Sequence, residues 1–174
     1  MLGNTDGRES PADMVELVRR AQRGDALAMD ELLGVLAPYV GRLCAPIALQ
    51  DGADATQEAL IAVFRGIRRL REPAALFGWV RVVAVREAVR VAKRNQRATV
   101  TELGEVPAAG DAQLAVDIRD VLAHLSPEHR AVLVLRDLDG LDEESVSALL
   151  AVPVGTVRSR LFRARRGFRK AWGR

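Results

Sequence analysis

Apolar residues recur at intervals of three or four through two stretches of this 174-residue chain, 13–97 and 114–174. Such spacing places them on one face of a helix, so each stretch is predicted to form amphipathic helices. Between them, residues 98–113 contain two glycines, one proline and no basic residue, and they lack this period. We therefore predict an all-α protein of two small helical domains joined by a flexible linker over 98–113. Residues 1–12 are polar and are predicted to be a flexible tail.

Turn-forming and capping residues predict where the helices begin and end. Pro38 either ends the second helix or kinks it. In the first stretch we predict turns at 24–25 and 46–52, a helix capped by Asp54, and a long helix over about 76–97. In the second stretch we predict helix starts at Ser126 and at Asp142 or Glu143, a tight turn over 152–155, and a final helix over about 156–171.

The charges are distributed very unevenly. The net charge of +3 comes from 26 basic and 23 acidic residues, but residues 65–97 hold ten basic and two acidic side chains. Residues 153–174 hold eight basic and no acidic ones. Two compact basic blocks indicate two separate contacts with a polyanion such as nucleic acid. Two ordinary solvated helix faces are the alternative.

Catalytic, metal and membrane functions find little support in the sequence. A single cysteine, Cys44, excludes an internal disulfide and a cysteine-cluster zinc site. The chain has no GxxxxGK loop and no HExxH motif, so we predict no enzyme activity, no metal and no cofactor. It also has no uncharged apolar run near 18 residues and no apolar signal segment at its start. We therefore expect a cytoplasmic protein that does not insert into a membrane.

The last predicted helix has two different faces. Its apolar stripe consists of Val154, Val157, Leu161, Ala164 and Phe168. The remaining surface is rich in arginine, which binds phosphates and guanine edges in the major groove. Two short helices joined by a tight turn, with arginine on the second, predict a helix-turn-helix. A basic helix on a membrane surface is the alternative, but it gives no reason for the turn or the acidic helix before it.

The second stretch also carries a specific resemblance. The runs VPVGTVRSRLFRARRGFR (152–169) and LSPEHRAVLVLR (125–136) resemble the C-terminal helix-turn-helix of extracytoplasmic-function (ECF) sigma factors of bacterial RNA polymerase. This resemblance implies that residues 114–174 form the sigma region 4 domain, which binds the minus-thirty-five promoter element. The residues implied to contact this upstream element are Thr156, Arg158, Ser159, Phe162, Arg163 and Arg166.

The first stretch fits the same family. The run DATQE (54–58) followed by Phe64 resembles the polymerase-binding helix of sigma region 2, which implies that residues 13–97 form that domain. The residues implied to bind polymerase are Asp54, Gln57, Glu58, Ile61 and Arg65. The run FGWVRVVA (77–84) is similar to the segment of the family that precedes its minus-ten contacts. The residues implied to face this downstream element are Trp79, Arg86, Arg90, Lys93, Arg94 and Arg97.

Two of these positions depart from the family pattern, and one has a second interpretation. Arg86 stands where many members have Asn, and Arg90 stands where an Asp is common. Both changes add positive charge beside the expected DNA-facing surface. Trp79 also fits a role in the core.

Together these features predict a sigma factor that binds core RNA polymerase, directs it to specific promoters and helps open the DNA. Its partners would be core polymerase and promoter DNA, and an anti-sigma factor is a further candidate because such proteins often inhibit family members. One alternative is a helix-turn-helix regulator that binds duplex DNA without polymerase. A metal-dependent nuclease and a degenerate homologue that acts only through protein contacts are others.

Overall fold

The computed structural model describes residues 11–99 and 113–173, and most of these residues are helical with no strand among them. The all-α prediction is therefore confirmed. Most of the predicted tail and linker lies outside the described residues, although residues 11–12, 98–99 and 113, at their edges, are helical. The helices are α1 (Pro11–Gln22), α2 (Ala26–Ala48), α3 (Gly52–Gly66), α4 (Leu76–Thr99), α5 (Gln113–Ala123), α6 (Pro127–Leu133), α7 (Glu143–Leu150) and α8 (Val154–Trp172).

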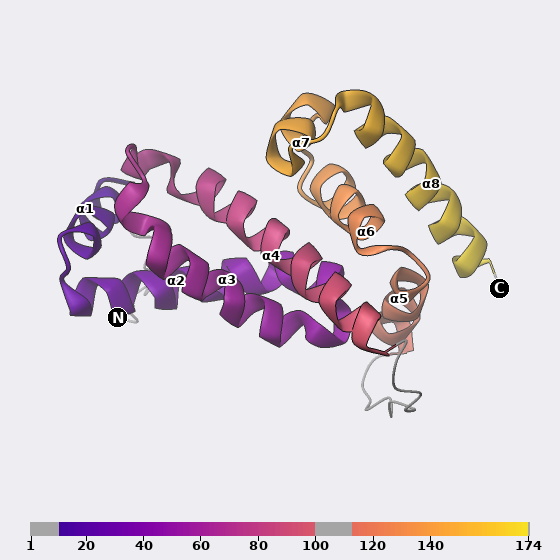
Figure 1. Cartoon of the computed structure of the whole chain (residues 1–174), viewed down its shortest axis with the longest axis horizontal. Helices are drawn as coiled ribbons and strands as arrows, with labels where there is room; N and C mark the ends of the chain where they lie inside the picture. The colour runs from indigo at the N-terminus through magenta and orange to yellow at the C-terminus, as the bar shows by residue number, and fades with distance from the viewer. Residues whose placement is uncertain (1–10, 100–112, 174) are drawn as a thin grey trace, which may run out of the picture.

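Helix α2 forms the centre of the first half of the molecule and packs against α1, α3 and α4 (Figure 1). Asp25 caps it by accepting from the Ala28 amide at 3.0 Å, just after the predicted turn at Gly24. Its buried residues recur at helical spacing and are Ala28, Leu32, Leu36, Val40, Leu43, Cys44, Ile47 and Ala48. By length and composition alone, the stretch Ala26–Arg69 could cross a membrane, but α2 and α3 within it fold against each other.

The predicted turn over 46–52 was wrong in its position. Helix α2 continues through both Pro38 and Pro46 to Ala48. Its last buried residues lie on the face that packs into the core, and this packing outweighs the missing proline amide. The chain reverses only at Leu49, which has a positive φ of 56°.

The predicted cap at Asp54 was also wrong. Helix α3 begins two residues earlier, at Gly52, directly after a short 3-10 turn, η1 (Leu49–Asp51). A Cβ atom at Gly52 would lie 3.1 Å from the Ala45 Cα atom, so glycine permits the close approach of α3 to α2. Asp54 therefore sits inside α3, and its carboxylate is available to another helix.

The second half contains the helix-turn-helix, α7 and α8. Ser126 caps α6 by accepting from the His129 amide at 3.3 Å, and Asp142 caps α7 by accepting from the Ser145 amide at 2.7 Å. Both helix starts were predicted. Helix α6 widens into a π-helical turn, η4 (Val134–Leu138), and α7 ends at Ala151 in the left-handed conformation.

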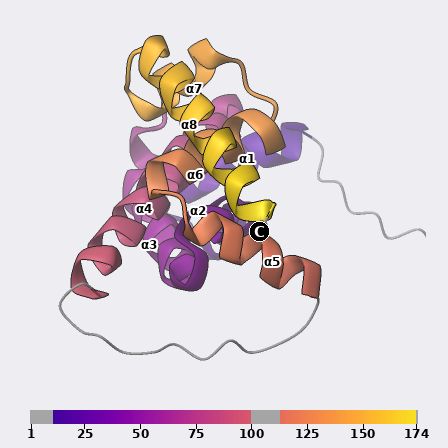
Figure 2. The same ribbon diagram turned by 90° about the vertical axis from the view of Figure 1, so that its right-hand side faces the viewer.

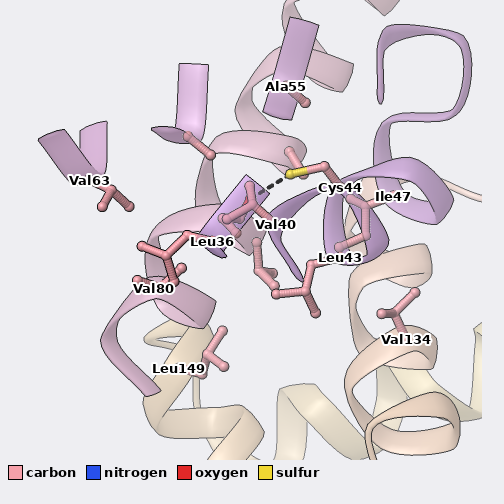
Figure 3. Packing of buried hydrophobic residues seen from close by; sticks show 14 of the residues in the cluster. Leu36, Val40, Leu43, Cys44, Ile47, Ala55, Val63, Val80, Val134 and Leu149 are labelled. Atoms are coloured by element: carbon pink, nitrogen blue, oxygen red, sulfur yellow. Dashed lines mark hydrogen bonds between the residues drawn. The ribbon is translucent and has the colours of Figure 1, made fainter. Parts of the chain in front are cut away.

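The two halves pack against each other and share one hydrophobic cluster. Helix α6 contacts both α2 and α4, and it lies between α8 and the first half of the chain (Figures 1 and 2). Figure 3 shows Val134 and Leu149 of the second half in the same cluster as Leu36 and Val40 of α2. In this arrangement α4 faces the second half along part of its length.

Candidate nucleic-acid and polymerase interfaces

Helix α8 presents an arginine-rich face to solvent. Val157, Leu161 and Ala164 are buried against the other helices of the second half, as the apolar stripe predicted. Phe162 is 64% exposed and lies among the arginines of the opposite face. Of the predicted upstream-element residues, Thr156 is half-buried and the other five are exposed. The fold thus brings all six to one side of α8.

Ion pairs anchor two arginines of α8 to neighbouring helices. Arg158 Nε lies 2.6 Å from Glu143 Oε2 in α7, and this carboxylate raises the pKa of the guanidinium. Arg165 Nη2 lies 2.6 Å from Asp137 Oδ1 in η4. Among the described residues, Arg163 and Arg166 make no ion pair. These two are therefore the most available cations on the predicted DNA-facing surface.

The exposed side of α3 carries an apolar groove of about 350 Å³. Phe64 is 54% exposed and Ile61 is 38% exposed there, although both are large apolar side chains. The groove is lined by Leu33, Ala53, Thr56, Gln57, Leu60, Ile61 and Phe64. Exposed apolar surface of this kind is typical of a protein-binding site. It includes the predicted polymerase-binding residues Gln57 and Ile61.

Two of the predicted polymerase-binding residues, Asp54 and Glu58, carry carboxylates, and both bind arginines of α4. Arg94 Nη2 lies 2.7 Å from Asp54 Oδ2, and Arg94 Nη1 lies 3.5 Å from Glu58 Oε1. Arg90 Nη2 lies 3.1 Å from Glu58 Oε2 and also pairs with Glu87. These contacts form an α3–α4 ion-pair ladder of Asp54, Glu58, Arg90 and Arg94. The ladder joins residues that the sequence assigned to two different sites.

Of the remaining predicted downstream-element residues, those whose side chains are described lie in three different environments. The Trp79 ring is half-buried over Gly66 of α3, where a Cβ atom would lie 2.9 Å from ring atom Cζ2, so it packs between helices. Arg86 Nε donates to the Leu149 carbonyl in α7 at 3.2 Å, and Lys93 pairs with Glu128 in α6. Arg97 lies in α4, but its side chain is outside the described residues.

Among the described residues, the most deeply buried charged side chain is Arg130, which was not among the predicted residues. It is 2% exposed, and its guanidinium donates to the carbonyls of Ile47 at 2.6 Å, Leu125 at 2.7 Å and Leu122 at 3.3 Å. Burial lowers the pKa of this guanidinium. The sequence did carry a signal, because Arg130 is four residues before Val134 on the apolar side of α6.

Arg81 is a second residue that the sequence analysis missed. Its Nε lies 3.3 Å from Asp139 Oδ2 in the second half, which is an ion pair but not a well-aligned hydrogen bond. Like Arg86 and Lys93, it belongs to α4 and binds a residue beyond the predicted linker. Within the part of the chain that the structure describes, no three His, Cys, Asp or Glu side chains gather as a metal site would require.

Comparison with known proteins identifies the class of this helix-turn-helix. Residues 115–166, which run from α5 into α8, match the family model "Sigma-70, region 4". By fold, the chain is similar to CnrH in its complex with the cytosolic domain of CnrY, with a TM-score of 0.60, 20% identity and coverage of 90% of this chain and 95% of that one. It is also similar to the sigma factor RpoE of Bartonella quintana in complex with the anti-sigma factor NepR, with a TM-score of 0.61, 19% identity and coverage of 82% and 94%.

Sequence similarity extends over both halves. The chain is 31% identical to the ECF RNA polymerase sigma-E factor of Escherichia coli K12, over 86% of this chain and 88% of that protein. It is 30% identical to the RNA polymerase sigma-H factor of Pseudomonas aeruginosa, over 90% and 92%. It is 35% identical to the ECF sigma factor SigE of Mycolicibacterium smegmatis over 84% of this chain, but the match spans only 63% of that longer relative. The chain belongs to the ECF sigma factors of RNA polymerase.

Proposed function

We propose that this protein binds core RNA polymerase, directs it to specific promoters and helps to open the promoter DNA. The observation that supports this most strongly is similarity to sigma factors over nearly the whole chain, together with an exposed arginine-rich face on α8. The protein would contribute binding and capture of unpaired bases rather than catalysis, so it needs no cofactor. Because it would act together with RNA polymerase, we expect it in the cytoplasm.

We assign each domain the role that the sequence resemblance implies. Residues 13–97 would form sigma region 2, residues 114–174 would form region 4, and residues 98–113 would link them. The α8 face would bind the minus-thirty-five element. The groove on α3 would bind polymerase, because its exposed Ile61 and Phe64 need a partner surface to cover them. The α4 cations would face the minus-ten element.

An anti-sigma factor is a further proposed partner. The structural neighbour RpoE is described in complex with the anti-sigma factor NepR, and the neighbour CnrH in complex with the cytosolic domain of CnrY. Many family members are inhibited in this way, and exposed apolar side chains such as Ile61 and Phe64 give such a protein a surface to cover.

Transcription in vitro tests the proposal directly. Purified core polymerase and fragmented genomic DNA are incubated with and without the protein, and transcript ends are mapped. Discrete start sites that depend on the protein are expected. If no such starts appear while a control sigma factor is active, the alternative of a helix-turn-helix regulator without polymerase is favoured.

Matched variants assign the two surfaces. Arg163→Ala should weaken upstream-element recognition and leave polymerase binding intact, whereas Lys170→Ala removes a charge from the end of the same helix and should change neither. Gln57→Ala should lower polymerase affinity relative to Gln50→Ala, an exposed glutamine outside the groove. Loss of polymerase binding in Arg163→Ala would contradict the assignment of α8.

A further inference from the structure

Glu143 and Arg158 form an ion pair between the two helices of the helix-turn-helix. Arg158 Nε donates to Glu143 Oε2 at 2.6 Å, which is a charge-assisted hydrogen bond. The Arg158 side chain is 66% exposed and the Glu143 side chain only 26%, so the carboxylate lies against the protein while the guanidinium reaches outward. Among the described residues, the two Nη groups of Arg158 bind no other side chain.

The backbone around this pair holds the carboxylate in a fixed position. Glu143 is the first residue of α7 and directly follows Asp142, which caps the helix by accepting from a backbone amide at 2.7 Å. The turn between α7 and α8 is tied by Ser147, whose Oγ donates to the Val152 carbonyl at 2.6 Å. The two helices pack against each other (Figure 1). Glu143 therefore reaches Arg158 from a rigid part of the motif.

Arg165, on the same helix, makes a different kind of ion pair. Its Nε and Nη2 both donate to Asp137, at 3.1 and 2.6 Å, so one whole edge of its guanidinium is occupied. Its side chain also lines an apolar pocket beside Phe168. Arg158 commits only Nε, and its Nη1 and Nη2 groups form an edge that can still give two parallel hydrogen bonds. Arg158 is therefore oriented by its partner without being used up by it.

The open edge of Arg158 matches the major-groove edge of guanine. Guanine presents two acceptors there, O6 and N7, and an arginine that donates to both is the commonest specific contact between a protein and DNA. Arg158 lies near the start of α8, and the N-terminal residues of a recognition helix are those that reach base edges. The pair with Glu143 is neutral overall, so it adds little to the attraction that phosphates exert on any basic surface. What it contributes to DNA binding is orientation.

We propose that Glu143 is a positioning residue for promoter recognition, and that it holds Arg158 so that the two Nη groups read one guanine of the upstream element. Glu143 does not touch the base itself. It restricts the rotamers of a long side chain before binding, so Arg158 loses less conformational entropy when it meets a base that accepts both hydrogen bonds. The inference rests on the proposed function and deepens it, because it names the base and the residue that sets the preference for it.

The test measures transcription by the complete holoenzyme from one promoter mapped in the transcription experiment above. Each base pair of its upstream element is replaced in turn by the other three, and the preference at a position is the ratio of transcript yields. The wild type should prefer guanine at one position by at least about fivefold, and Arg158→Ala should abolish the preference at that position alone. At the same position, 7-deazaguanine, which lacks the N7 acceptor, should lower the yield for the wild type but not for Arg158→Ala.

Substitutions at Glu143 separate positioning from charge. Glu143→Ala should lower the preference for this guanine by at least about threefold, and in an Arg158→Ala background it should have no further effect, because it acts through Arg158. Glu143→Gln keeps an oxygen that can accept from Arg158 Nε, so it should retain more of the preference than Glu143→Ala. The matched control is Glu144→Gln, which removes the same charge from an exposed neighbour and should leave the preference unchanged.

Four results would overturn the proposal. There could be no guanine whose preference depends on Arg158, or Glu143→Ala could keep that preference. Glu143→Ala could also lower transcription equally from every promoter variant, which would mean that Glu143 only stabilises the motif. Finally, it could raise transcription equally from every variant, which would mean that the carboxylate only repels DNA. In all four cases the wild-type holoenzyme still initiates at the mapped promoter, so the proposed function stands.

Failure of the proposed function gives a different result. The wild-type protein would then produce no start sites with a core polymerase that is active with a control sigma factor. The same variants are in that case compared on the sequence that the full-length protein alone enriches from random 20-base-pair duplex DNA. Loss of one guanine in Arg158→Ala and its weakening in Glu143→Ala would still support the positioning role, whereas a wild-type protein that enriches no sequence would reject it.

Discussion

Replacement of Arg130 by methionine tests how much one buried cation contributes to the fold. The guanidinium is 2% exposed and donates to carbonyls in α2, in α5 and just after α5. Methionine has a similar length and no charge, so it keeps most of the volume but provides no donor. The Leu122 carbonyl also accepts from the Leu125 amide at 2.9 Å, so it keeps a partner in the variant. The Ile47 and Leu125 carbonyls lose a charged donor.

The magnitude follows from these contacts. A buried carbonyl left without a donor costs about 1 to 3 kcal/mol, which gives about 2 to 6 kcal/mol for two. Removal of the buried charge recovers part of this, because its desolvation penalty disappears. We therefore expect Arg130→Met to lower the free energy of unfolding by about 2 to 4 kcal/mol. Arg130→Lys keeps the charge but not the planar fork, and it should fall between this variant and the wild type.

Urea denaturation followed by circular dichroism at 222 nm measures the effect. The matched control is Arg119→Met, which makes the same substitution at an exposed position in α5 and should change stability by less than about 0.5 kcal/mol. Equal stability of the two variants would refute the inference that the Arg130 hydrogen bonds stabilise the fold.

Three further predictions concern stability and reactivity. Ala151→Gly should raise the free energy of unfolding by about 1 kcal/mol in urea denaturation, because Ala151 ends α7 with a φ of 53°, which is strained for alanine. Gly66→Ala should lower the free energy of unfolding by about 1 to 2 kcal/mol, since the new Cβ would lie 2.9 Å from the Trp79 ring. The control Gly34→Ala, in the exposed middle of α2, should raise the free energy of unfolding slightly. Burial raises the pKa of the Cys44 thiol to about 11 from its ordinary 9.0, so an aromatic disulfide reagent at pH 8 should modify it only on unfolding. In the unfolded chain the Cys44 thiol ionises at a lower pH than in the folded protein. The stability that Cys44 contributes is therefore present below pH 9 and is lost as the pH rises to about 11. A free energy of unfolding that rose over this range would contradict the burial of Cys44.

The helices could be predicted wherever a local signal coincided with the packing. Ser126 and Asp142 cap helices as predicted, because capping depends only on a side chain and an amide three residues later. The turn after Pro46 was misplaced because burial of Ile47 and Ala48 in the core extends α2 beyond its local preference. Boundaries set by tertiary packing leave no comparable signal in the local sequence.

Site residues could be assigned to a helix face from the sequence, but the residues that they contact could not be predicted. Helical projection correctly placed the exposed arginines of α8 opposite Val157 and Leu161. It could not reveal that Asp54 of α3 would bind Arg94 of α4, because the two residues are 40 positions apart. Contacts between helices depend on how the helices are oriented in space, and that orientation comes from the whole core.

The α3–α4 ion-pair ladder has a consequence for both proposed surfaces. Its members are 35% to 50% exposed, and such ion pairs contribute only about 0 to 1 kcal/mol each. They are therefore strong enough to orient Arg90 and Arg94 in the free protein but weak enough to exchange for phosphate. Because Asp54 and Glu58 hold these cations, a polymerase surface that binds the carboxylates would release the arginines toward DNA. The same charges would then serve polymerase binding and DNA binding in sequence, with a dependence on salt concentration at each step.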